Sequence, residues 1–345
     1  MVGSLAGIRA LGVCCPLGMS FKETAESYRQ GERNFVKSSD VIGPDGLPVR
    51  IACVFAFGKP RNFELRLQRL FEAAVDDLKS QLPENAERAD LRLLVPDWFM
   101  ENPLREPLQS WILEQFGNWF ATVTFLSGKE TVFLVELALA LQSVNDGNCN
   151  SCFVGALDSL MHAEFIDILA LQDRLLTKDN PHGVIPGEGA VIAYVTPGEQ
   201  GINGNLGTVL AAYRGFEEEN FRQPQGILGR GLAKPLTLAL RDWQPDRFMV
   251  NLNGERWRSE DLSFALSASP SLPDHLAGDF ETPPLYCGEC GVVTDAIMTA
   301  LSLVPPPDMS EDLSSKSVIT HIAISQRSGL RCVGVTERYV GENPV

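Results

Sequence analysis

Residues 127–159, which read SGKETVFLVELALALQSVNDGNCNSCFVGALDS, contain the features that decide the fold. The run 132–144 has the length of a helix and is apolar nearly all round, which is typical of a helix buried on every side. It ends at the turn signal Asp146-Gly147, and a short apolar strand begins at Cys152. The stretch therefore predicts a central, buried helix followed directly by a core strand.

Strands and helices alternate on both sides of this stretch, a pattern that predicts crossover units and a mainly parallel sheet. A glycine-rich linker at 197–204 separates two such series. The predicted strands are 8–14, 49–55, 91–95, 120–125, 152–156, 205–214 and 247–252, with a hairpin at 317–338. The predicted helices are 21–30, 65–82, 104–116, 132–144, 163–174, 231–242, 259–266 and 291–304.

Four further motifs lie along the chain: ALGVCCPLG at 10–18, IPGEGA at 185–190, VNLNGE at 250–255 and YCGECG at 286–291. With 127–159, their order and spacing resemble those of the β-ketoacyl synthases of the thiolase superfamily. The landmarks extend from about residue 8 to residue 338, and IPGEGA is the most specific of them. The resemblance implies an α/β, thiolase-like five-layer αβαβα fold. It also implies two similar halves, 1–198 and 204–345, that pack tightly as one unit.

The resemblance also locates the family's catalytic triad of one cysteine and two histidines. Counting back from Gly147 and Gly155 places the cysteine position at Glu130, and the two histidine positions fall on Asn253 and Glu289. A helix N-terminus stabilises a thiolate, but a carboxylate there is a poor acyl acceptor for a thioester. We therefore expect these three residues to converge without normal decarboxylative condensing activity.

Several roles are open for the three residues. Glu130 and Glu289 could each cap the helix that follows, with Asn253 bridging nearby backbone. Alternatively, two carboxylates and an amide could perform acid–base chemistry or bind a cation or small ligand. The function predicted is a degenerate synthase-like scaffold, accessory or partner subunit without catalysis. The alternative is an enzyme with altered chemistry on acyl-CoA or acyl-carrier thioesters, using Glu130 as base.

Other candidate sites have simpler interpretations. Two CxxC pairs, 149–152 and 287–290, have the spacing of zinc ligands, but Cys152 enters an apolar strand, which favours buried, reduced thiols. The four histidines lie apart and are interpreted as surface or satisfied residues: His162, His182, His275 and His321. The Gly-Arg-Gly sequence at 229–231 is too short to define an anion site. We predict no metal and no cofactor.

Composition limits the partners. The net charge of −15 argues against generic nucleic-acid binding and against attraction to anionic membranes. A local basic patch at Arg66 and Arg69, with Lys59 and Arg61 upstream, is one candidate; a solvated helix face is the alternative. No apolar stretch is long enough to span a bilayer and no basic region precedes the first apolar residues, so a cytoplasmic protein is expected.

The segment 119–126, WFATVTFL, is apolar and β-prone, and an exposed edge of this kind is an aggregation hazard unless paired. The resemblance implies dimers formed through this strand, and a homodimer is predicted. An active synthase, a carrier protein or a protein of a bacterial secretion or biosynthetic operon is a possible further partner.

Overall fold

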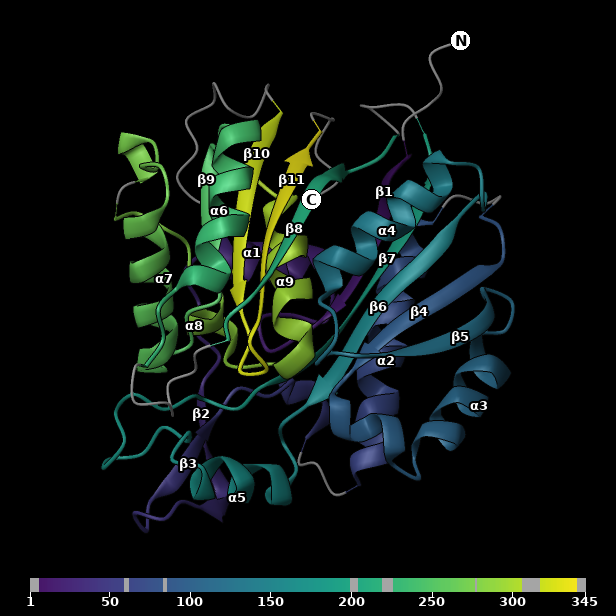
Figure 1. Ribbon diagram of the computed structural model, residues 1–345. Helices are drawn as coiled ribbons and strands as arrows, with labels where there is room; N and C mark the ends of the chain where they lie inside the picture. The colour runs from purple at the N-terminus through teal and green to yellow at the C-terminus, as the bar shows by residue number, and fades with distance from the viewer. Residues whose placement is uncertain are drawn as a thin grey trace.

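A nine-stranded mixed sheet, ordered β5-β4-β6-β7-β1-β8-β11-β10-β9, forms the framework of the protein in the computed structural model (Figure 1). The structure describes residues 6–58, 62–82, 86–198, 204–218, 226–276, 278–305 and 317–339. The strands are β1 (Ala6–Cys14), β4 (Ala89–Val95), β5 (Phe120–Ser127), β6 (Cys152–Ser159), β7 (Glu188–Pro197), β8 (Gly207–Phe216), β9 (Arg247–Val250), β10 (Val318–Ser325) and β11 (Leu330–Arg338).

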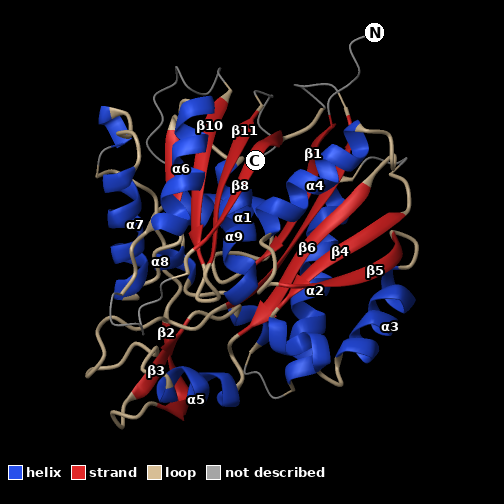
Figure 2. Cartoon of the chain, in the orientation of Figure 1, coloured by secondary structure: helices blue, strands red, loops and turns tan. Residues whose placement is uncertain are grey.

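Helices lie in three layers around this sheet (Figure 2). One outer layer contains α2 (Phe63–Gln81) and α3 (Arg105–Phe116), which pack against β1 and β4 to β7. The other contains α6 (Arg230–Asp242) and α7 (Arg256–Ala268), over β8 to β11. Between the two parts of the sheet lie α4 (Phe133–Asn145) and α9 (Thr294–Ser302). The remaining helices are α1 (Phe21–Arg29), α5 (Ala163–Leu171) and α8 (Pro284–Cys287).

The central position of α4 follows from its sequence. Phe133, Leu134 and Leu137 are fully buried, and α4 contacts strands from both parts of the sheet. Gly334 of β11 permits close approach, because a Cβ there would lie 2.7 Å from Leu134 Cδ1. The buried helix between two sheet regions confirms the five-layer expectation. The division into halves at 1–198 and 204–345 stays a prediction, and linker residues 199–203 lie outside the described residues.

The expectation of a mainly parallel sheet is wrong. Only β4–β5, β4–β6 and β9–β10 pair in parallel; the other five ladders of the large sheet are antiparallel. Parallel neighbours need a crossover that covers the sheet. The chain between β6 and β7 instead places α5 away from the large sheet, and β10 returns directly as β11, so both pairs are antiparallel.

A small lobe projects below the large sheet in Figure 1. It consists of the hairpin β2 (Val36–Ile42) and β3 (Pro48–Ile51), helix α5 and the loop 172–184. Val49, Ile166, Leu169, Leu175 and Val184 form its own apolar core. We call this unit the hairpin lobe.

Candidate functional site

Glu130 lies in the turn between β5 and α4, and its side chain is exposed. Its backbone N–H donates to Ser127 O at 3.1 Å, and its carbonyl accepts from Arg214 Nη2 at 2.8 Å. Its carboxylate makes no hydrogen bond or ion pair within the described part of the chain. The expectation that Glu130 caps its own helix is wrong, because α4 begins only at Phe133 and has no side-chain cap of its own.

Asp295 of α9 stabilises the start of α4 instead. The Phe133 N–H donates to Asp295 Oδ2 at 2.7 Å, across 162 residues of sequence. Burial raises the pKa of Asp295 to about 7, although backbone N–H groups, that of Phe133 first among them, oppose this shift. A carboxyl group at a helix N-terminus also interacts favourably with the helix dipole. The helix start that carries a nucleophile in the family is therefore occupied from the opposite half of the chain.

Asn253 and Glu289 meet, as the resemblance predicts. Asn253 Nδ2 donates to Glu289 Oε2, and Arg258 Nη2 donates to the same oxygen at 3.1 Å. Both predicted residues are 6% exposed. Glu289 does not cap a helix; its Oε1 accepts from the Thr294 hydroxyl at 3.4 Å. No hydrogen bond or ion pair of the described residues joins Glu130 to this cluster.

Glu255 extends the cluster and binds three arginines. Arg174 Nε donates to Glu255 Oε1 at 2.9 Å, Arg327 Nη1 donates to the same oxygen at 3.0 Å, and Arg258 Nε lies 3.8 Å from Oε2. Burial alone would raise the pKa of Glu255, but Arg258 and Arg174 outweigh it and lower the pKa to about 2. The polar run 251–258 indicated Glu255 and Arg258; nothing in the sequence indicated Arg174 or Arg327.

The PGEG motif holds Glu289 in place through its backbone. Gly187 N–H donates to Glu289 O, and Glu289 N–H donates to Ile185 O, both at 2.8 Å. A Cβ on Gly187 would lie 2.9 Å from Cys290 Sγ, so this close approach requires glycine. The motif thus positions the residue at the second histidine position of the resemblance.

Glu188 of the same motif forms a buried ion pair with Arg66. Arg66 Nε donates to Glu188 Oε2 at 2.8 Å, and the Ser159 hydroxyl donates to the same oxygen at 3.0 Å. Arg66 is 3% exposed, so it belongs neither to a basic patch nor to a solvated helix face, and both interpretations of it are wrong. Arg69 is exposed. Lys59 and Arg61 lie outside the described residues.

Asp158, which follows the core of β6, has no exposed surface to speak of and accepts from Val292 N–H at 3.1 Å. Burial, opposed by this N–H and reinforced by the charge of Glu289, raises the pKa of Asp158 to about 7. Gly291 contacts the same carboxyl: its φ is +60°, and a Cβ there would lie 1.9 Å from Asp158 Oδ2. Asp158 therefore fixes the segment that links Glu289 to α9.

The other candidate groups are structural in the described residues. These residues contain no group of three or more His, Cys, Asp or Glu side chains that could hold a metal ion. Cys152 is buried as expected, and burial raises the pKa of its thiol to about 12. The Gly231 N–H at the start of α6 donates to Glu217 Oε2 at 2.8 Å, so an internal carboxylate fills the Gly-Arg-Gly turn. His321 is fully buried, contrary to its interpretation as a surface or satisfied residue.

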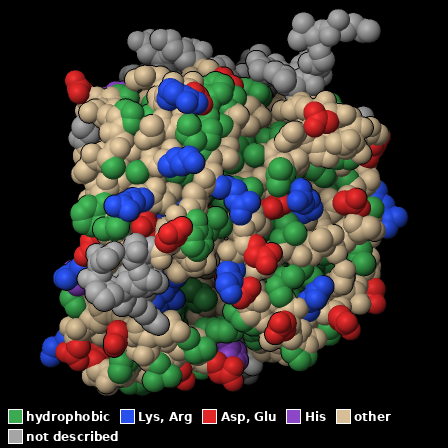
Figure 3. Space-filling model, viewed as in Figure 1, with side chains coloured by type: hydrophobic (Ala, Val, Ile, Leu, Met, Phe, Trp, Pro, Cys, Tyr) green, Lys and Arg blue, Asp and Glu red, His purple; other side chains and the backbone are tan. Residues whose placement is uncertain are grey.

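Acidic and basic side chains of the described residues are interspersed on the face seen in Figure 3. None of the helices in the described ranges combines the length and apolar character that crossing a membrane requires.

No protein-family model matches the chain, and no curated protein matches its sequence. Solved structures do match. The ishigamide ketosynthase/chain length factor has a TM-score of 0.72 at 16% identity, with 98% of this chain and 100% of that chain covered. A ketosynthase in complex with its chain length factor from Xenorhabdus doucetiae has a TM-score of 0.69 at 14% identity, with 97% and 98% covered.

A third match is a type II PKS acyl-carrier protein in complex with its ketosynthase bound to the hexaketide. Its TM-score is 0.71 at 13% identity, with 98% of this chain and 100% of that chain covered. Similarity over nearly the whole of each chain, together with the buried α4 and the layered sheet, identifies the architecture. The protein has the thiolase-like fold found in ketosynthases and chain length factors.

Proposed function

We propose that this protein is a ketosynthase-like chain without condensing activity that serves as a scaffold, accessory or partner subunit. The observation that supports this most strongly is the state of Glu289. Its carboxylate, at a position where the resemblance calls for a histidine, is buried and bound by Arg258 and Asn253. The cluster is thus satisfied internally.

Condensation needs donors where negative charge develops on the enolate and the thioester oxygen. Glu289 presents a carboxylate, which would repel that charge. The Asn253 amide already donates to Glu289 and, at 3.2 Å, to Glu255. Glu130 is a poor acyl acceptor and has no neighbouring base among its described contacts. Each of the three positions therefore lacks the group that the reaction needs.

The alternative enzyme, with Glu130 as a base toward acyl thioesters, gains no support from the geometry. A general base is held in position by hydrogen bonds or packing, whereas the Glu130 side chain is exposed and has no such bond within the described residues.

Assembly with a second chain fits the proposal. The matched structures include a ketosynthase with its chain length factor and a carrier protein with its ketosynthase. Here β5 is an edge strand of the large sheet, at the place expected for dimer formation. A homodimer through β5, or a heterodimer with an active synthase, follows as the finer proposal.

An activity assay tests the first part. The protein is incubated with an acyl thioester and a malonyl thioester of CoA and of a carrier protein, and CO₂ release and thioester hydrolysis are measured beside an active ketosynthase. We expect neither product above the protein-free rate. Turnover that Glu130→Gln abolishes at an unchanged melting temperature, and that the exposed α7 control Glu260→Gln retains, would establish the enzyme instead.

A native pull-down from the host tests the second part, with bound proteins quantified by mass spectrometry. Recovery of a cysteine-bearing synthase or a carrier protein supports a partner subunit in acyl chemistry. Recovery of other proteins at fixed stoichiometry supports a scaffold. Recovery of the chain alone as a monomer contradicts both forms of the proposal.

A further inference from the structure

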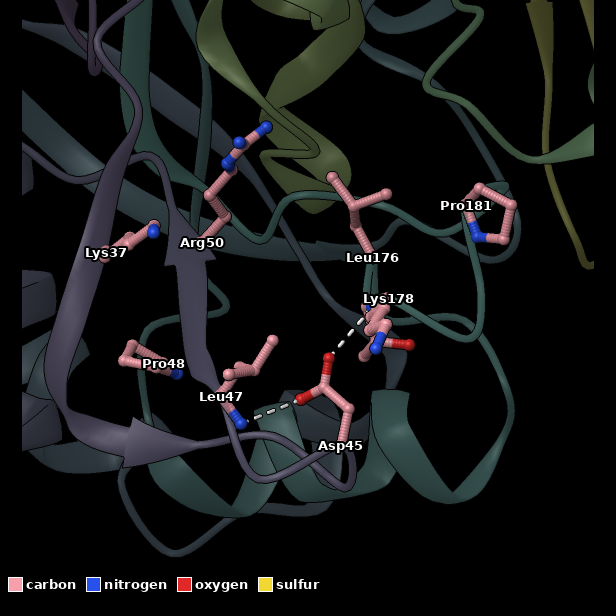
Figure 4. A pocket seen from close by; sticks show the side chains of 9 residues that line it. Lys37, Asp45, Leu47, Pro48, Arg50, Leu176, Lys178 and Pro181 are labelled. Carbon is pink, nitrogen blue, oxygen red and sulfur yellow. Dashed lines mark hydrogen bonds between the residues drawn. The ribbon is translucent and has the colours of Figure 1, made fainter.

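A cavity of about 360 Å³ opens in the hairpin lobe, between the hairpin β2–β3 and the facing segment 176–181 (Figure 4). This volume lies within the range of small-molecule sites, roughly 300–1,000 Å³. Its floor comes from Leu47 and Pro48, and Leu176 and Pro181 face them. The cavity is separate from the cluster at Glu289, and none of its lining residues belongs to that cluster.

Three cationic side chains line this cavity: Lys37, Arg50 and Lys178. Lys37 and Arg50 are direct register partners on β2 and β3, so two like charges lie opposite each other on neighbouring strands. Such a pair is destabilising. None of the three forms an ion pair or side-chain hydrogen bond with the side chains that the structure describes. Their positive charge therefore remains available to a ligand.

The one carboxylate in the cavity does not neutralise these cations. Asp45 accepts backbone N–H bonds from Lys178 at 2.9 Å and from Leu47 at 3.1 Å, as the dashed lines in Figure 4 show. These two bonds, that from Lys178 first, lower the pKa of Asp45. Asp45 thus ties the hairpin turn to the opposite loop and sets the width of the cavity.

We propose that this cavity binds a small organic phosphate. A phosphate dianion between Lys37 and Arg50 would relieve their repulsion, and Lys178 would approach it from the facing loop. A guanidinium and two ammonium groups are typical phosphate ligands. The apolar wall of Leu47, Leu176 and Pro181 would contact the organic part. In a chain of net charge −15, attraction of anions is a local property of this cavity, independent of the function proposed above.

Calorimetric titration with phenyl phosphate at low ionic strength tests this site. We expect saturable binding to one site with a dissociation constant of about 1 mM or lower. Arg50→Gln and Lys178→Gln each weaken binding about tenfold or more, because each removes a charged hydrogen bond to the phosphate. The matched control is Arg69→Gln, the same change of charge at an exposed position of α2 outside the cavity. It retains the affinity, and melting temperatures verify that all variants fold.

Two further titrants separate the charge from the apolar wall. Phenol, which lacks the phosphate, should not bind, and inorganic phosphate should bind more weakly than phenyl phosphate. Absence of saturable binding, equal loss in Arg69→Gln, or binding of phenol as tight as that of phenyl phosphate would overturn the site. Inorganic phosphate that binds as tightly as phenyl phosphate would overturn the assignment of an organic ligand.

Discussion

At the scale of single residues, His321 is the titratable group with the clearest effect on stability. It lies in the middle of β10, fully buried, and neither ring nitrogen has a well-formed hydrogen bond within the described structure. Its neighbours Ile322 and Ala323 pack in the central core and the outer core respectively. Because side chains alternate along a strand, His321 faces the outer core under α6 and α7. Burial disfavours its charged form and lowers the pKa of His321 to about 4.

Acid should therefore destabilise the protein through His321. The unfolded chain binds this proton with a pKa of about 6.5, above the folded value, so stability is full above pH 6.5 and is lost as the pH falls toward 4. The loss through this residue is about 3 kcal/mol. Replacement by leucine should flatten this part of the urea-unfolding profile, and the exposed control His275→Gln should not. An unchanged acid limb in His321→Leu would contradict the assignment.

Arg258 is the residue on which the Glu289 cluster depends. Arg258→Met removes the guanidinium that serves both Glu289 and Glu255, and a buried carboxylate that loses its partner is costly. We expect a loss of about 3 kcal/mol in the free energy of unfolding at pH 7, measured by urea denaturation. Adding Glu289→Gln should restore part of it. A loss below about 0.5 kcal/mol would mean that the cluster is hydrated and adaptable rather than internally satisfied.

At the scale of elements, the segment between Glu289 and α9 depends on the contact of Gly291 with Asp158. Gly291→Ala combines a left-handed backbone with a collision between the new Cβ and the Asp158 carboxyl. Gly31→Ala shares the left-handed φ, +69°, but meets nothing within 4 Å. We expect Gly31→Ala to cost about 1 kcal/mol and Gly291→Ala at least about 2 kcal/mol more, by thermal or urea unfolding. Equal costs would show that the Asp158 contact is soft.

The elements could be predicted where their pattern is strong. The apolar run 132–144 gave α4, and the apolar stretches around Ser328-Gly329 gave the hairpin of β10 and β11, each within one or two residues of the observed bounds. Strand β2 was missed because its sequence, VKSSDVI, is polar at its centre and has no alternation. Arg174 and Arg327 could not be found, since only the tertiary fold brings these loop residues to Glu255.

The site was predicted in part for the same reason. Motif spacing placed Asn253 and Glu289 together, and the structure joins them. The cap of α4 could not be predicted, because Asp295 acts across 162 residues and local sequence favoured Glu130.

At the scale of the whole molecule, the two edges of the large sheet differ. At one edge, β9 bonds on its outer side to the chain at Glu281, which exchanges backbone hydrogen bonds with Phe248 and Val250 at 2.9 Å. At the other, β5 pairs with no further strand of the described residues, and only some of its carbonyls accept side-chain bonds, such as that from Gln109 to Val123. An apolar edge that is left open in this way is managed by pairing with another chain.

A charge placed on that edge should therefore dissociate the dimer. Thr124 is exposed on β5, and Thr124→Lys introduces an edge lysine, the residue by which natural sheets resist pairing. We expect wild-type protein to scatter light as a dimer and Thr124→Lys to scatter as a monomer of unchanged melting temperature. Ser267→Lys adds the same side chain to the exposed face of α7, in the opposite outer layer, and should stay dimeric. If wild type is already monomeric, or if both variants dissociate alike, the open edge has another use, and the covering chain must come from a different protein.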